Sequence, residues 1–311
     1  MRSRFAYKLL LLPALLAFTT APMAGCAEAH PSPLKVLVAI GTQPGAQEGD
    51  FERDDVISAA GAKLDEPLLI LINGNPRAHH RHGGTMLEIN HWLQPGPNTI
   101  TIRGRRSHPL HVKLGTHQHD RVRQIWVRKK IEVDDRDEVT LEFEVGPQQE
   151  MADHPLPRTF YPHHQIDRSD KDRLRRELTD WVMDFDRLLQ QRDGERVARM
   201  VMAGQADWSP RFYDTSARRI QTVHDHVAAR FGSETTRFTP IDPDSLRFEF
   251  GPGVVMVYAG FAQASPYQAV LTEAELDGEQ TWLDALFLAP DDDGWMVWQL
   301  GDFRIRERLR R

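Results

Sequence analysis

The stretch SDKDRLRRELTDWVMDFDRLLQQRDG, residues 169–194, marks the point at which the pattern of apolar residues changes from strand-like to helical. Its apolar residues recur every three or four positions, which predicts a long helix with one buried stripe. Ser169 and Asp172 have the spacing of a capping box at its start, and Asp193-Gly194 is a stop signal at its end. The stripe consists of Leu174, Leu178, Trp181, Val182, Phe185, Leu188 and Leu189.

On the N-terminal side of this helix, the apolar residues occur in short alternating runs separated by Gly, Pro and Asn. Alternation places one face of each strand in a core and the other face in water. The runs are 34–40, 68–72, 99–102 and 139–145. They predict an antiparallel β-sandwich over residues 34–147, followed by a connector over 148–168.

On the C-terminal side, the sequence predicts a short helix over 195–203 and a third helix that begins near Ser216. Five strands are expected after them, over 246–250, 254–258, 268–276, 281–289 and 295–300. Helices followed by an antiparallel meander are typical of an α+β domain. The predicted fold class is therefore multidomain, with an all-β sandwich, an α+β domain over 169–305 and a basic tail over 306–311.

Two segments resemble known families. Leu87–Ile102 resembles the glycine turn and strand of galactose-binding-like sandwiches, and 169–305, with Asp293-Gly294-Trp295-x-Val297, resembles the NTF2-like or SnoaL-like cone fold. Enzymes of the cone fold place an acid or a histidine in an interior pocket. That resemblance implies the candidate catalytic residues Tyr213, Asp214, His224 and Asp284. Because other members are binding or assembly modules, the fold leaves the function open.

The N-terminus has the three parts of an export signal, with Arg2, Arg4 and Lys8 before an apolar core and small residues after it. Met23-Ala24-Gly25-Cys26 resembles a bacterial lipobox, and Cys26 is the only cysteine of 311 residues. The resemblance implies cleavage of residues 1–25, lipidation at Cys26 and a lipid-anchored linker over 26–33. Ala27, in place of aspartate, favours the outer membrane, facing the periplasm. The alternative is ordinary secretion with cleavage after Ala29.

Charge limits the partners that the mature chain can bind. Loss of Arg2, Arg4 and Lys8 from 39 basic residues leaves 36 against 45 acidic residues, a net charge of −9. This charge argues against a nucleic-acid partner. A basic stretch between Arg103 and Lys130 has two interpretations: contact with anionic lipid or lipopolysaccharide phosphates, or a wet sheet face balanced by the neighbouring acids.

Histidines are concentrated before residue 165 and include two His-x-His pairs, His80 with His82 and His117 with His119. In a strand, such a pair projects both rings from one face and suits Zn(II), Cu(II) or Ni(II). Solvated surface histidines are the favoured interpretation, because no cysteine or well-spaced acid completes a site. We expect no cofactor.

Taken together, these patterns predict a cell-envelope lipoprotein with a non-enzymatic binding or assembly role. It would attach to the membrane through its N-terminal lipid and bind an envelope protein or a glycan. Two alternatives remain open: a periplasmic enzyme that uses the pocket of the cone, and a metal-binding protein that uses the histidines.

Overall fold

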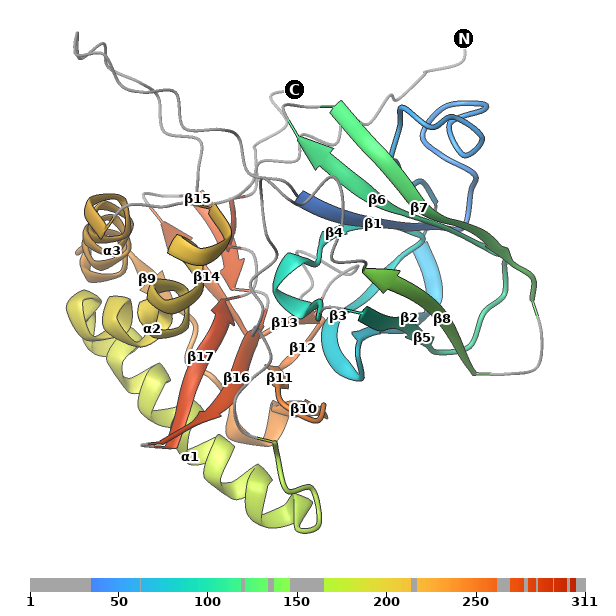
Figure 1. The fold of residues 1–311 in the computed structure, drawn as a ribbon. Helices are drawn as coiled ribbons and strands as arrows, with labels where there is room; N and C mark the ends of the chain where they lie inside the picture. The colour runs from blue at the N-terminus through green and yellow to red at the C-terminus, as the bar shows by residue number, and fades with distance from the viewer. Residues whose placement is uncertain are drawn as a thin grey trace, which may run out of the picture.

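The computed structural model describes residues 35–61, 63–94, 96–118, 121–133, 137–145, 165–213, 217–261, 269–276, 279–283, 285–292, 294–300 and 303–305. The predicted leader, Cys26, the linker and the basic tail lie outside these residues, as do His119, Asp214 and Asp284. The described part is rich in antiparallel sheets and contains three α-helices. A β-rich chain with helices after residue 165 is the architecture that the sequence predicts (Figure 1).

Two four-stranded sheets form the N-terminal half, with the strand orders β4-β1-β6-β7 and β3-β2-β5-β8. Together they are called the N-terminal sheet pair. Their strands are β1 (Lys35–Gly41), β2 (Lys63–Ile72), β3 (Asn75–His82), β4 (Gly84–Glu88), β5 (Gly96–Arg103), β6 (Leu110–Gln118), β7 (Arg121–Ile131) and β8 (Glu138–Val145). A short 3-10 helix, η1 (Asn90–Trp92), follows β4. Four of the strands contain the four alternating runs of the sequence, so those predictions are confirmed.

Asparagines organise the turns of the sheet pair. Asn73 and Gly74 both have positive φ, 51° and 77°, which is the backbone of a tight hairpin turn between β2 and β3. Asn98 is buried, and its amide donates to the carbonyls of Gln94 and Gly96 at 2.7 and 2.8 Å. Its oxygen accepts from the Asn73 amide at 2.8 Å. The Asn98 side chain therefore provides hydrogen-bond partners for backbone groups in the turn that leads into β5.

The C-terminal half begins with three helices, α1 (Lys171–Gln191), α2 (Gly194–Tyr213) and α3 (Ala217–Gly232). Two four-stranded sheets follow, ordered β10-β11-β16-β17 and β18-β15-β14-β9, with a small β12-β13 pair. The strands are β9 (Arg237–Phe238), β10 (Arg247–Phe250), β11 (Val255–Tyr258), β12 (Gly260–Phe261), β13 (Ala269–Val270), β14 (Thr272–Leu276), β15 (Glu279–Leu283), β16 (Leu286–Asp291), β17 (Gly294–Leu300) and β18 (Phe303–Ile305). A 3-10 helix, η2 (Pro243–Ser245), precedes β10. The β10-β11-β16-β17 sheet is called the central sheet.

Four element predictions differ from the structure. The N-cap of α1 is Asp170, whose carboxylate accepts from the Arg173 amide at 2.8 Å, so Ser169 is not the cap. Helix α2 continues ten residues past the predicted end at 203, to Tyr213, because it packs against both α3 and β17. The predicted strand 281–289 is divided into β15 and β16, and the predicted strand 268–276 into β13 and β14. In both cases the two parts belong to different sheets.

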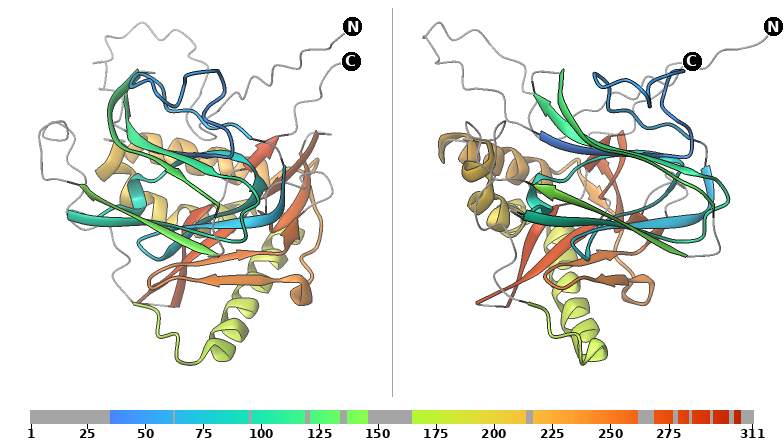
Figure 2. Two further views of the ribbon diagram at one scale, coloured as in Figure 1. Left: turned by 90° about the vertical axis from the view of Figure 1, so that its right-hand side faces the viewer. Right: turned by 45° about the vertical axis from the view of Figure 1, so that its right-hand side comes forward.

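The central sheet is buried on both faces. One face packs against the helices through Val255, Val257, Leu286, Leu288 and Val297, which share a core with α1 and α2. The other face shares the core of the N-terminal sheet pair through Val254, Met256, Tyr258, Phe287 and Trp298. Figure 2 shows the resulting layers: the two sheets of the pair, the central sheet, and then α1. The two halves of the chain therefore share the apolar core on one face of the central sheet, and a second core lies on its helix side.

Candidate functional site

The contact between the two halves brings together side chains that are remote in sequence. It is called the seam and consists of His79 on β3, Trp92 on η1, Glu249 on β10, Tyr258 on β11 and Phe287 on β16. Strand β3 contacts β10, β11 and β13 directly. In Figure 1, η1 lies between the sheet pair and the central sheet.

Aromatic rings close the apolar part of the seam. The Trp92 and Phe287 rings meet edge to face, with their centroids 5.6 Å apart. Both side chains are buried, at 4% and 3% exposure. Aromatic pairs of this geometry contribute beyond the area that they bury. This face of the central sheet is consequently filled by side chains of the N-terminal half.

Ionisable groups form the polar part of the seam. The Tyr258 phenol hydrogen-bonds the Glu249 carboxyl, and the His79 ring meets the Tyr258 ring edge to face with centroids 5.1 Å apart. Burial and, to a smaller extent, nearby Arg81 lower the pKa of His79 to about 4. Burial also raises the pKa of Tyr258 and, against the effect of Arg103, that of Glu249. At neutral pH, His79 and Tyr258 are therefore uncharged, which suits a packed interface better than a catalytic centre.

Of the four candidate catalytic residues, three have no described side chain. Only His224 has a described side chain: it lies on α3, is 18% exposed, and its Nδ1 is 3.5 Å from the Asp225 carboxylate. Tyr213 is the last residue of α2, and Asp214 and Asp284 lie outside the described residues. A catalytic group formed by these four residues therefore stays a prediction.

Aromatic and apolar side chains fill the described interior between the helices and the central sheet. Phe185 is fully buried in this core, and the Trp181 ring stacks on it with centroids 5.9 Å apart. The Trp181 indole donates to the Trp295 carbonyl at 3.0 Å. Of the acids on α1, Asp186 is buried, and its Oδ1 accepts from the Ile241 amide and the Gln190 side chain. This carboxylate attaches the segment before η2 to α1.

The predicted metal ligands have local backbone contacts. His80 and His82 lie on β3, and the Nδ1 of His80 accepts from the His82 amide at 3.2 Å. The Nδ1 of His82 accepts from the Gly84 amide at 3.1 Å and lies against the Gly84 carbonyl. Among the described residues, no group of three or more His, Cys, Asp or Glu side chains is arranged to hold a metal ion. His117 is on β6, whereas His119 lies outside the described part.

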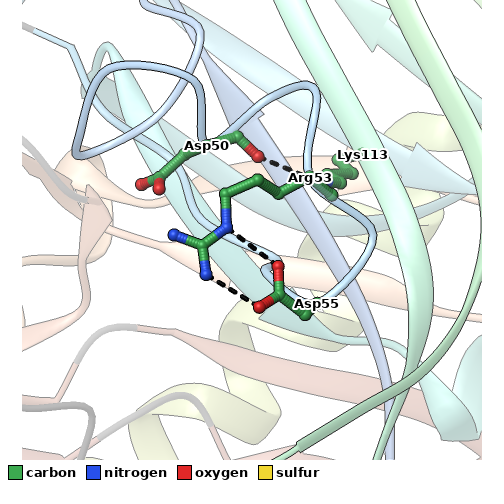
Figure 3. A network of polar contacts seen from close by, with 4 residues as sticks. All are labelled: Asp50, Arg53, Asp55 and Lys113. Atoms are coloured by element: carbon green, nitrogen blue, oxygen red, sulfur yellow. Dashed lines mark hydrogen bonds and ion pairs between the residues drawn. The ribbon is translucent and has the colours of Figure 1, made fainter.

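A second buried polar group lies under the loop over residues 42–60. The sequence did not predict that this group is buried. Lys113 on β6 is 1% exposed, and its Nζ donates to the carbonyl of Asp50 at 2.9 Å and to that of Arg53 (Figure 3). Arg53 is itself bound to Asp55 by two hydrogen bonds. Burial and nearby Arg128 lower the pKa of Lys113, and Asp54 and Asp50 oppose this effect. The lysine is thus a buried cation that holds the loop to the sheet.

No sequence signal identifies these contacts in advance. Lys113 belongs to a basic stretch whose pattern indicates an exposed sheet face. The two ring contacts of the seam, His79 with Tyr258 and Trp92 with Phe287, join residues more than 170 positions apart. None of the described helices is long and apolar enough to cross a membrane. No family model, curated protein or solved structure matches the chain. A function must accordingly be argued from its residues and their geometry.

Proposed function

We propose that this protein is a cell-envelope lipoprotein with a binding or assembly role rather than a catalytic one. In this proposal, Cys26 carries the lipid, and the outer membrane, facing the periplasm, is the location. The N-terminal sheet pair is a galactose-binding-like sandwich and the C-terminal half an NTF2-like cone. The partner is an envelope protein or a glycan.

One observation carries the non-catalytic part of the proposal: the central sheet is packed on both faces. The helix side is filled by residues such as Phe185 and Leu288, and the other side by the sheet pair. A catalytic site needs a concave space into which a few polar groups converge. The ionisable groups of the seam instead serve an internal contact, which favours a rigid body that presents its outer surface.

The position of Cys26 supports the anchored part of the proposal. It follows Ala24-Gly25 at the end of the leader and is the only cysteine of the chain. Each buried methylene of an acyl chain contributes about 0.8 kcal/mol, so two chains hold a protein stably on a membrane. The first described strand begins at Lys35, nine residues after Cys26. A lipid at Cys26 would therefore keep the sheet pair close to the membrane.

The intact mass of membrane-extracted protein tests this proposal. We expect a chain that begins at Cys26 and carries acyl groups, whereas Cys26→Ala leaves the protein unprocessed or released. As a matched control, Ser32→Ala changes another small residue of the segment after the leader. This variant should carry the same acyl groups, and its mass should differ only by the lost serine oxygen. An unmodified chain that begins after Ala29 would overturn the anchor.

A further inference from the structure

The two edge strands on the open side of the N-terminal sheet pair carry opposite charges. Strand β7 ends one sheet and β8 ends the other. Within Arg121–Ile131, β7 has five basic residues and no acid, whereas β8 has three acids and no basic residue. The basic residues are Arg121, Arg123, Arg128, Lys129 and Lys130, and the acids are Glu138, Glu142 and Glu144.

The two edges lie at one level across the core. The rings of Trp126 on β7 and Phe143 on β8 stack, with centroids 6.5 Å apart. Because only residues 132–137 connect the strands, β8 runs back opposite to β7, as Figure 1 shows. The opposite side of the pair, by β3, is covered by the central sheet. In the described part of the chain, neither β7 nor β8 has a strand on its outer side.

Several of the edge charges have no ion-pair partner among the described residues. Arg128 pairs with Asp54, Lys130 with Glu132, and Arg103 with Glu138. Arg123 and Lys129 are exposed and form no ion pair with any described residue, and the same is true of Glu142 and Glu144. Charges on edge strands normally discourage pairing with another strand. Here a β7 edge repels another β7 edge, and β8 repels β8, but β7 and β8 carry opposite charges.

The geometry points to a dimer in which β7 of one copy pairs with β8 of a second copy. The two copies are related by a twofold axis that runs parallel to the strands, next to the β7 and β8 edges. This axis places the β7 sheet of one copy in line with the β8 sheet of the other. Each β7 then lies next to the second copy's β8. Rotation about that axis preserves strand direction, so the two strands are antiparallel and both sheets continue across the interface. The contact is closed and isologous, which is the common form of a dimer.

Register supports this arrangement. The axis keeps each residue at its own height, so Trp126 lies level with Phe143 of the second copy. Because the strands are antiparallel, positions are counted forward along β7 from Trp126 and backward along the second copy's β8 from Phe143. Lys129 then lies within two residues of both Glu138 and Glu142. Arg123 lies within two residues of Glu144. Long charged side chains interact across such diagonal positions. Pairing β7 with β7, or β8 with β8, would instead bring like charges together.

Charge reversal on each edge tests the dimer. The protein is the chain from residue 26 onward with Cys26→Ser, which keeps every described residue and removes the lipid, so the result does not depend on the proposed anchor. One variant carries Glu142→Lys and Glu144→Lys, and the other Arg123→Glu and Lys129→Glu. Sedimentation equilibrium should show a dimer for the unmodified edges and a dimer Kd raised more than about tenfold in each variant.

Mixing the two variants is the decisive measurement. In each variant alone, positions 123 and 129 of β7 carry the same sign of charge as positions 142 and 144 of β8. In a mixture, both β7–β8 contacts of a heterodimer have opposite signs at these positions. We expect a heterodimer with a Kd near that of the original dimer. The control Glu48→Lys with Glu195→Lys makes the same net charge change as Glu142→Lys with Glu144→Lys, on exposed residues elsewhere, and should leave the dimer intact. Monomeric unmodified protein, a dimer insensitive to both variants, or no association on mixing would each overturn the proposal.

Discussion

At the residue scale, two lysines of the same basic stretch have different structural roles. Lys113 and Lys129 both lie in the basic stretch of the sequence, yet Lys113 is buried beneath a loop and Lys129 is exposed on an edge strand. The difference comes from the loop over residues 42–60, whose carbonyl oxygens converge on the Lys113 amino group. Residue type alone does not distinguish the two positions.

Lys113→Met should destabilise the protein by about 2–3 kcal/mol, because it removes the charged hydrogen bonds from the buried amino group to the carbonyls of Asp50 and Arg53. The loop over 42–60 should also become sensitive to limited proteolysis. Urea unfolding of this variant is compared with Lys129→Met, which changes an exposed lysine and should stay within about 0.5 kcal/mol of the original protein. Equal stability of the two variants would contradict the role assigned to Lys113.

Acid should weaken the seam through His79. The pKa of His79 in the fold is about 4, below the value of 6.5 for an exposed histidine. The unfolded chain therefore binds more protons than the folded chain as the pH falls below 6.5. Stability is lost down to about pH 4, by about 3 kcal/mol in all. Glu249, whose pKa is raised, acts in the opposite direction as the pH rises.

Comparison with His79→Phe isolates this histidine, because phenylalanine keeps an aromatic ring at the site but does not titrate. Urea unfolding at pH 7 and pH 5 should show a smaller loss of stability in His79→Phe than in the original protein. His108→Asn, which changes an exposed histidine, provides the control. A pH dependence that is unchanged in His79→Phe would contradict the assignment.

At the scale of elements, periodicity locates helices better than it locates their ends. Helix α1 has the predicted buried stripe, with Leu174, Leu178, Val182 and Phe185 in the core. Its first residue is set by a side chain, because Ser169 and Asp170 both suit an N-cap and only the backbone geometry selects between them. The Asp170 carboxylate makes the capping bond, and the Ser169 amide donates to Asp167 at 3.0 Å.

Asp170→Ala should therefore cost about 1 kcal/mol of stability, whereas Ser169→Ala should cost less than about 0.5 kcal/mol. Thermal or urea unfolding of the two variants under one condition measures the difference. The reverse order of the two effects would show that the capping box predicted at Ser169 is the one that operates.

At the scale of the whole molecule, the core between the sheet pair and the central sheet makes the two halves interdependent. Phe287 on the central sheet packs against Trp92 of the N-terminal half, and both belong to one apolar cluster. A chain with independent halves would instead bury each sheet separately. Sharing of a core predicts a single cooperative unfolding transition.

Phe287→Ala should lower the stability of both halves together, by about 3 kcal/mol or more, because it leaves a cavity at the seam. Hydrogen exchange should show equal losses of protection in β2 and in β16. Val133→Ala, at a side chain that is 47% exposed, is the control and should have little effect. Loss of protection confined to β16 would contradict a shared core.

The sequence by itself determined the local patterns: the strand runs before residue 145, the amphipathic helix after 169, and the turns at Asn73-Gly74 and Asn98. These depend on neighbouring residues, whose periodicity and turn chemistry act over a few positions. It did not determine the division of 281–289 between two sheets, the burial of Lys113, or the seam of His79, Tyr258 and Glu249. Those features depend on which distant surfaces pack together, and only the tertiary structure decides that, because hydrophobic burial is not directional and carries no information about its partner.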